Sequence, residues 1–419
     1  MSPRRLSDTD WVHLVGVLAF VALLSIGYYY NLTFVQLGLI DLGTRLVGMT
    51  AQSVSTVMAI FAVSAFGVAA VTGWTMDRVG WSSDLRVKLR ILFSVIAVQT
   101  GLTMVVGSVT TSSQYLTWVL AGAAAIGVGM PVTFSFMIDF IPIRHRGGIA
   151  AAVAGLAFFG AAIYPLQWRI EEFAPVMTAV MVPGVAVLGI VSFRRFDFID
   201  TLARQHERFG VGRFCRPLPV HTASFAFWGP LLLMFSVFFI DSLGFLRIIE
   251  SPAYISTSWQ STDAGVRLFI AVTHIVGAAM AGILYTVFDR RWIWGAVLAL
   301  FAFTHLLYTF PAPAGVDPPL SLPLFYVLAV SFYTTLNFAL WADLSTPSNI
   351  GLHAGLGVGI AGWLASFLST SLALYSEGVG VTLLDHLRYV NALSLLLAVA
   401  FPVALYLRRM RRLAVRGLP

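Results

Sequence analysis

The residues best placed to do chemistry in this chain are the few ionisable side chains inside long apolar segments. Asp241 follows the start of one such segment, at Phe225, by about 24 Å if the segment is a helix rising about 1.5 Å per residue. If this segment spans a membrane, insertion of the charged Asp241 side chain costs about 2.5–3.5 kcal/mol. A residue with such a cost is interpreted as functional by default. Asp241 could bind a cationic substrate group, carry a proton, or pair with Arg247 or Arg267.

A second ionisable residue, His274, lies inside a later apolar segment. Histidine has a near-neutral intrinsic pKa, so His274 could take part in proton coupling. The simpler interpretation is a structural histidine that is held by hydrogen bonds. Both interpretations place it within a span.

One polar stretch, Gly73 to Arg90, separates two apolar segments and opens with Gly73, Asp77, Arg78 and Gly80. Glycine lets membrane helices approach closely. Asp77 could lie at the N-terminus of a facing helix, for about 0.3–2 kcal/mol, or pair with an arginine. A breakable interaction of this size suits a conformational switch. The alternative is an ordinary charged turn between spans.

The composition shows which elements must position these residues. Hydrophobic residues make up 58% of the chain, charged residues only 11%, and the mean hydropathy is +0.85. Soluble domains have about 25% charged residues. Apolar runs of about 20 residues, enough to cross a bilayer, recur along the chain. They do not alternate as barrel strands would. We predict an all-α polytopic membrane protein.

Twelve spans are predicted, six on each side of a polar segment at residues 193–224. They cover approximately Val12–Gly38, Ser53–Thr75, Leu89–Val109, Tyr115–Ile138, Gly148–Gln167, Ala174–Ser192, Phe225–Ile248, Val266–Phe288, Ile293–Phe310, Leu322–Trp341, Leu352–Tyr375 and Val390–Leu407. The predicted domains are residues 1–192, a surface linker at 193–224, and residues 225–419 with a basic tail.

The placement of lysine and arginine predicts orientation, because basic loops remain in the cytoplasm. With both termini inside, 21 of the 26 basic residues fall on the inner side. We therefore expect a multi-pass protein of the cytoplasmic membrane with both termini cytoplasmic. The excess of basic residues is explained by the membrane topology and by contact with anionic lipid headgroups, so nucleic-acid binding is not needed to explain it.

The two halves resemble each other. Asn31 and Asp241 end similar motifs 210 residues apart, Asp77 recurs as Asp289 after 212 residues, and Asp139 recurs as Asp343 after 204. Such repeats are typical of secondary transporters, with a substrate site between the halves near the bilayer midplane. We predict two pseudo-symmetric bundles of six helices.

The chain resembles the major facilitator superfamily over essentially its full length. Gly73-x-x-x-Asp77-Arg78-x-Gly80 resembles the family's loop between helices two and three, and Asp139-x-x-Pro142-x-Arg144-x-Arg146-Gly147 resembles the loop between helices four and five. The resemblance implies two bundles that rock about a central cavity and a gate at their interface. The gating candidates are Gly73, Asp77, Arg78, Gly80, Asp139, Arg146, Asp289, Arg290 and Asp343. The fourth span lacks the arginine of many drug exporters, which leaves multidrug export open.

Helices one, four, seven and ten usually line the cavity in this family, which selects the substrate-binding candidates. These are Tyr28, Tyr29, Asn31, Tyr164, Gln167, Asp241, His274, Tyr333 and Asn337. Interhelical hydrogen bonding, worth only about 0.6 kcal/mol on average, is the alternative role for the neutral residues. At most two of the adjacent tyrosines can face one cavity. Gln99 is left out because the third helix is usually peripheral, and His305 is interpreted as a packing or lipid-side residue.

Motifs for other functions are absent from the sequence. No phosphate-binding Gly-x-x-x-x-Gly-Lys-Ser/Thr motif and no helical His/Glu metal spacing occurs, and Cys215 is the only cysteine. We expect no enzyme activity and no cofactor. The predicted function is secondary transport of a small organic solute by a monomer, with protons as the default coupling ion. The alternative is a protein that keeps the transporter fold to bind or assemble a lipid or pigment.

Overall fold

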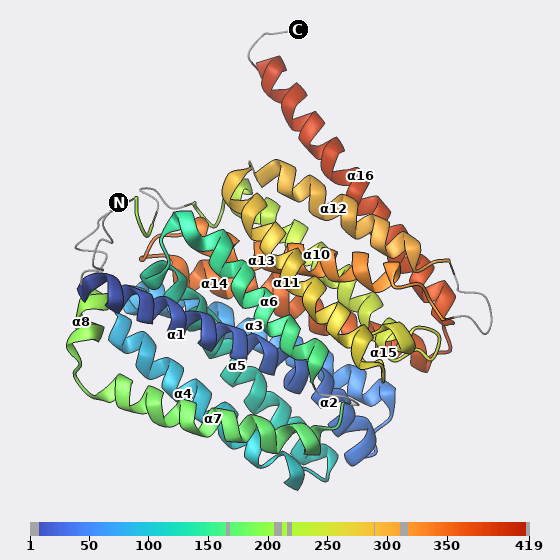
Figure 1. Cartoon of the computed structure of the whole chain (residues 1–419), viewed down its shortest axis with the longest axis horizontal. Helices are drawn as coiled ribbons and strands as arrows, with labels where there is room; N and C mark the ends of the chain where they lie inside the picture. Colours follow the sequence, from blue (N-terminus) through green and yellow to red (C-terminus); the bar gives the residue numbers. More distant parts are fainter. Residues whose placement is uncertain are drawn as a thin grey trace.

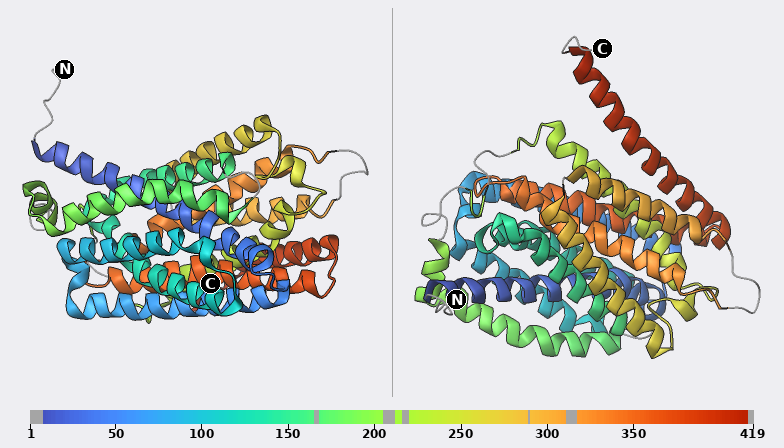
Figure 2. Two further views of the ribbon diagram at one scale, coloured as in Figure 1. Left: turned by 90° about the horizontal axis from the view of Figure 1, so that it is seen from below. Right: turned by 45° about the horizontal axis from the view of Figure 1, so that its top comes forward.

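The computed structural model describes residues 8–164, 168–204, 212–215, 220–288, 290–310 and 317–415. Within these residues every regular element is a helix and no strand occurs. The long helices run in roughly one direction, and loops connect them at the two ends (Figure 1, Figure 2). This confirms the predicted all-α membrane architecture.

The first half contains six long helical segments. The first is nearly continuous from α1 (Asp8–Tyr30) through η1 (Asn31–Leu37), α2 (Gly38–Asp41) and η2 (Leu42–Leu46). The others are α3 (Ala51–Val79), α4 (Leu85–Met104), α5 (Ser112–Phe140), α6 (Arg146–Ile163) and α7 (Ile170–Phe193), followed by the short α8 (Asp197–Ala203).

The second half repeats this pattern. Its helices are α10 (Phe225–Ile249), α11 (Ala264–Val287), α12 (Arg290–Leu307), α13 (Ser321–Asp343), α14 (Ile350–Val358) continued through η7 (Gly359–Leu364) into α15 (Ala365–Gly378), and α16 (Leu383–Val415). The end of α16 projects away from the other helices (Figure 1).

Eleven of the described helices are long and apolar enough to cross a membrane, and a shorter apolar helix, Trp292–Leu307, lies between two of them. These twelve segments follow the order of the twelve predicted spans. The first is longer than the predicted Val12–Gly38, because η1, α2 and η2 continue the helix to Leu46.

Polar side chains cap the helices where they begin. Asp84 accepts hydrogen bonds from the backbone N–H groups of Arg86 (2.9 Å) and Val87 (3.1 Å) at the start of α4. Thr111 and Gln114 form a capping box at the start of α5. These side chains satisfy backbone donors that have no partner within the helix. Gly80 ends α3 with a φ of 83°, in the left-handed region that favours glycine.

The two halves meet along two symmetric helix pairs, α3 against α14 and α15, and α6 against α11. At each crossing two glycines bring the backbones together. A Cβ atom on Gly351 would lie 2.7 Å from the carbonyl oxygen of Gly73, and one on Gly147 would lie 2.7 Å from that of Gly282. Small residues at such crossings allow close packing of membrane helices.

We call the end of the molecule with the loops at 80–84, 141–145 and 344–349 the linker end, and the opposite end the far end. The linker contacts both halves there. The backbone N–H of Ile143 donates to the carbonyl of Arg213 (2.9 Å), and that of Val220 donates to the carbonyl of Leu344 (3.1 Å). Phe214 and Cys215 are buried. This described part of the linker is therefore packed into the protein and is not only a surface connection.

Candidate functional site

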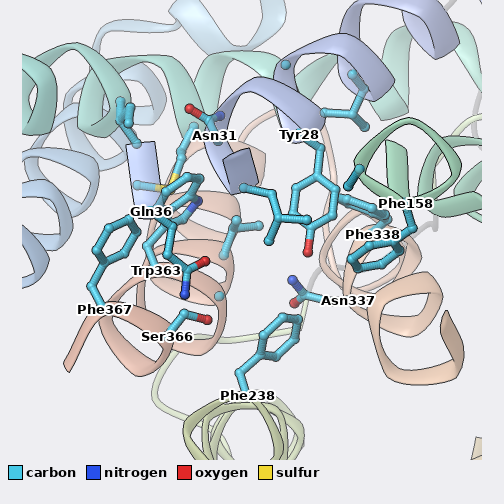
Figure 3. A pocket seen from close by; sticks show the side chains of 18 of the residues that line it. Tyr28, Asn31, Gln36, Phe158, Phe238, Asn337, Phe338, Trp363, Ser366 and Phe367 are labelled. Carbon is cyan, nitrogen blue, oxygen red and sulfur yellow. The ribbon is translucent and has the colours of Figure 1, made fainter. Parts of the chain in front are cut away.

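A cavity of about 160 Å³ lies between the two halves (Figure 3). The first half contributes residues of α1, η1, α4, α5 and α6, and the second half contributes residues of α10, α13, α14, η7 and α15. Toward the far end its lining reaches Ile249, the last residue of α10, and Trp259 in the following loop. The cavity therefore lies between the two halves and extends toward the far end.

Five of the nine substrate-binding candidates line this cavity: Tyr28, Asn31, Asp241, Tyr333 and Asn337. The hydroxyl group of Tyr28 points toward Asn337 (Figure 3). The side-chain oxygen of Asn337 accepts a hydrogen bond from Trp341 Nε1 (2.8 Å). This bond holds the amide in place and leaves its NH₂ group as a donor for the cavity.

Asp241 is the one residue with a carboxyl group among the described residues that line the cavity, and it is 7% exposed. The hydroxyl group of Tyr326 donates to the backbone carbonyl of Asp241 (3.4 Å), and the hydroxyl groups of Tyr326 and Tyr333 lie near its carboxyl group. Arg247 donates to the carbonyl of Val381 (3.3 Å) and lies 3.8 Å from Glu377, between Nη1 and Oε2, and Arg267 donates to the carbonyl of Ser261 (2.5 Å). Within the described part of the chain, neither arginine forms the ion pair that would give Asp241 a purely structural role.

At the linker end, Asp77 joins the two halves. Its Oδ1 accepts a hydrogen bond from the backbone N–H of Gly351 (2.9 Å), and its Oδ2 accepts one from Leu352 (2.7 Å). Ser82 also donates to Oδ1 (2.5 Å). The N–H groups of Gly351 and Leu352 belong to the first turn of α14, where the helix dipole favours a negative charge. Of the two partners open to Asp77 in the sequence, the structure places it on the helix N-terminus.

Arg146 and Asp343 form a second link between the halves, with 2.7 Å between Nη1 and Oδ1. Tyr285 donates to the other carboxylate oxygen of Asp343 (2.7 Å), and Arg146 also donates to the carbonyl of Phe214. Both ion-pair partners are buried. The linker end is thus closed by polar contacts, while the cavity lies beyond them.

Comparison with known proteins identifies the architecture. No protein-family model matches the chain, and no curated protein matches it in sequence. Solved structures do match. The human organic anion transporter MFSD10 (TETRAN) aligns with a TM-score of 0.63 at 15% identity, over 94% of this chain and 100% of that chain.

Two further transporters align over similar lengths. The proton:xylose symporter XylE, bound to 6-bromo-6-deoxy-D-glucose, has a TM-score of 0.59 at 13% identity, covering 92% of this chain and 94% of that chain. A bacterial homologue of the iron transporter ferroportin, in an outward-facing state with soaked iron, has a TM-score of 0.59 at 14% identity. The alignment covers 93% of this chain and 98% of that chain. This chain has the major facilitator superfamily fold.

Among the described residues, the gating candidates Asp139 and Arg78 lie on the linker side of this fold. Asp139 forms a buried ion pair with Lys88, whose Nζ also donates to the carbonyl of Ser82 (2.9 Å). This pair therefore stays within the first half. Arg78 lies over the ring of Trp74, with 5.0 Å between Cζ and the ring centroid. Asp289 and the side chain of Arg290 are outside the described residues.

Three substrate-binding candidates are not among the residues that line the cavity. The hydroxyl of Tyr29 donates to the carbonyl of Tyr164 (2.9 Å), so both tyrosines serve the contact between α1 and the segment before α7. His274 accepts a hydrogen bond from Trp259 Nε1 (3.1 Å) and shares one with Ser331 through Nδ1 (2.9 Å). These contacts match the interpretation of His274 as a structural histidine held by hydrogen bonds. Gln167 lies outside the described residues.

The cavity also contains polar residues that sequence reasoning missed. Gln99 was left out as peripheral, yet it lines the cavity together with three apolar residues of α4. Gln99 reaches the cavity because α1 and α5 leave a gap between them and α4 closes that gap. Gln36 donates to Thr370 of the second half (3.1 Å). The available signal for both was a glutamine inside an apolar span. His305 is buried against Phe301, as a packing residue.

Proposed function

We propose that the protein is a secondary transporter that moves a small organic solute by alternating access between its two halves. The observation that carries this proposal is the combination of an interhalf cavity and a linker end closed by separable polar contacts. Asp77 on the α14 N-terminus and the Arg146–Asp343 pair both cross the interface. Each contact can break without unfolding a helix, as a rocking motion requires.

The moving units are residues 1–192 and 225–419, joined by the linker at 193–224. In the proposed orientation the linker end faces the cytoplasm, both termini are cytoplasmic, and the membrane is the cytoplasmic one. The excess of basic residues at the linker end supports this orientation. Each chain has both halves and its own cavity, which supports a functional monomer.

Asp241 is the proposed carrier of a coupling proton. Its carboxyl group lies in the cavity next to hydroxyl groups and without a cationic partner among the described residues. A membrane-embedded carboxyl group in such surroundings is suited to gain and lose a proton. The transporters with similar folds are named for an organic anion, xylose and iron, so the solute must be inferred from this chain's own cavity.

Site-directed labelling tests alternating access directly. Cys215 is first replaced by serine, and Ser242, which lines the cavity, is replaced by cysteine. A membrane-impermeant thiol reagent is then applied to vesicles of both orientations. Alternating access requires labelling from both sides, with opposite changes when a solute binds. Labelling from one side only, whatever is added, would instead support a binding or assembly factor that keeps the fold.

A further inference from the structure

The cavity has two chemically different regions. Its second-half wall carries the one carboxyl group of the described lining, that of Asp241, together with Ser242, Tyr333 and Asn337, while the first half adds the uncharged polar side chains of Tyr28, Asn31, Gln36 and Thr133. Its first-half wall extends into a chamber between α1, α4 and α5 that is predominantly aliphatic. The chamber residues are Leu23, Leu24, Leu92, Val95, Ile96, Ile126 and Met130, with Gln99 among them. A solute that fills both regions must itself be amphiphilic.

The charge of the cavity has one sign. Asp241 is acidic, and no lysine, arginine or histidine occurs among the described residues that line the cavity. The nearby His274 is held by Trp259 and Ser331, and Arg247 lies against Glu377. An organic anion would be buried beside a carboxylate without a counter-charge, which is costly in a membrane interior. A cation would meet an opposite charge there.

Aromatic rings add a second feature that favours a cation. Phe338 packs against Tyr28 with 4.9 Å between ring centroids, and Phe238 packs against Tyr333 with 4.7 Å. Both pairs line the cavity, and Figure 3 shows Tyr28 on one side of Asn337 and Phe238 on the other. The faces of aromatic rings attract ammonium groups, and most strongly where water is excluded.

We propose that the substrate is an amphiphilic organic cation, with its ammonium group at Asp241 among these rings and its hydrocarbon part in the chamber between α1, α4 and α5. This proposal rests on the proposed transport function and specifies its substrate class. The whole cavity, of about 160 Å³, is close in size to an apolar cavity of about 150 Å³ that holds a benzene molecule, so the part of it between α1, α4 and α5 has room only for a short hydrocarbon group. One carboxylate holds a proton or an ammonium group, so the two compete for Asp241.

The first test measures equilibrium binding to the protein in lipid nanodiscs by calorimetry. The probes are hexyltrimethylammonium, which cannot lose its charge, and the chain-matched hexan-1-ol and hexanoate. We expect the cation to bind at least tenfold more tightly than hexan-1-ol and hexanoate not to bind measurably. Asp241→Asn should weaken cation binding at least tenfold, whereas Asp263→Asn, at an exposed helix cap, should not. Equal affinity for the three probes would overturn the proposal.

The second test addresses the chamber. Ile96 lines it from α4, and Val98, two positions along the same helix, is 50% exposed on the outer surface. In the wild type, hexyltrimethylammonium should bind more tightly than tetramethylammonium. Ile96→Phe should remove this gain, Ile96→Ala should move the optimum to a longer chain, and Val98→Phe should leave both unchanged. The same chain-length dependence in all four proteins would place the hydrocarbon part elsewhere and refute the chamber.

These binding results are separate from transport. If proteoliposomes transport a different solute and the cation does not bind, the substrate class is refuted while the transport function stands. If the cation binds as expected but no solute or cation crosses the membrane under any gradient, the substrate class stands and the transport function is refuted.

Discussion

Arg146 and Asp343 form an ion pair that joins the two halves of the molecule, although 197 positions separate them in the chain. Arg146 begins α6, and Asp343 ends α13. Both side chains are buried, Tyr285 donates a hydrogen bond to Asp343, and Arg146 donates one to the linker carbonyl of Phe214. The pair therefore couples each half to the other and to the segment that connects them.

Removal of one partner of this pair should destabilise the protein. Arg146→Gln leaves the carboxylate of Asp343 buried without its counter-charge, and loss of one partner of a buried pair costs about 3–5 kcal/mol. We expect a lower melting temperature and greater access of cysteine probes to the cavity from the linker end. The double variant Arg146→Gln/Asp343→Asn should recover part of the stability. Additive losses in a double-mutant cycle would show that the two residues do not interact.

Asp77→Asn should weaken closure of the linker end. The neutral amide loses the favourable interaction of a charge with the α14 N-terminus, a term of about 0.3–2 kcal/mol. The cavity cysteine Ser242→Cys should then be labelled faster from the linker side. Asp84→Asn is the matched control, because Asp84 caps α4 through two backbone N–H groups within one half. If Asp77→Asn leaves labelling rates unchanged, Asp77 has no gating role.

Gly147→Ala should separate the halves at the linker end. Its new Cβ atom would lie 2.7 Å from the carbonyl oxygen of Gly282 and 2.8 Å from the hydroxyl oxygen of Thr286. We expect more labelling of the cavity from the linker side and a lower melting temperature. The adjacent Gly148→Ala has open space around its Cβ atom and should be neutral or slightly stabilising, since alanine favours a helix by about 1 kcal/mol over glycine. Equal behaviour of the two variants would argue against tight packing there.

Asp241→Asn should uncouple transport from the proton gradient. A protonated carboxyl group is neutral, so cation binding to the wild-type protein should weaken as the pH falls. The asparagine variant cannot exchange a proton, so its residual transport should be independent of pH and follow the solute gradient alone. Solute flux in proteoliposomes, with and without an imposed pH gradient, measures both effects. Uptake that remains gradient-driven in the variant would assign the proton to another group.

Glu250, at the far end just beyond α10, should make stability depend on pH. Although part of Glu250 is exposed, burial of its carboxyl group raises its pKa from 4.5 to about 7, with Glu377 adding to the shift and Arg247 opposing it. Between these two pH values the folded state binds more protons than the unfolded state, so stability falls as the pH rises through this window. Glu250→Gln should flatten this part of a melting-temperature profile. An unchanged profile would mean that Glu250 is solvated normally.

The spans were predictable because their signal is local. A bilayer requires about 20 apolar residues per helix, and the sequence shows such runs without reference to any other part of the chain. The two aspartates Asp139 and Asp343 could also be recognised as repeated positions. Their partners could not, since Asp139 binds Lys88 in its own half and Asp343 binds Arg146 in the other.

The cavity lining was only partly predictable for the same reason. Tyr28 lines the cavity and Tyr29 does not, although the two are adjacent and chemically identical, because consecutive helical residues face different directions. Gln99 reaches the cavity only because α1 and α5 leave a gap that α4 closes. Such a gap depends on how whole helices pack.

The sequence by itself determined the helices, their order, the duplication and the presence of a carboxyl group at depth in the seventh span. These features follow from composition and spacing, which act within a single segment. Only the tertiary structure decided that Asp77 lies on the N-terminus of α14, that Arg146 pairs with Asp343, and that Asp241 faces a cavity rather than an arginine. The physical reason is that these contacts join residues far apart in the chain, whose meeting depends on the packing of every helix between them.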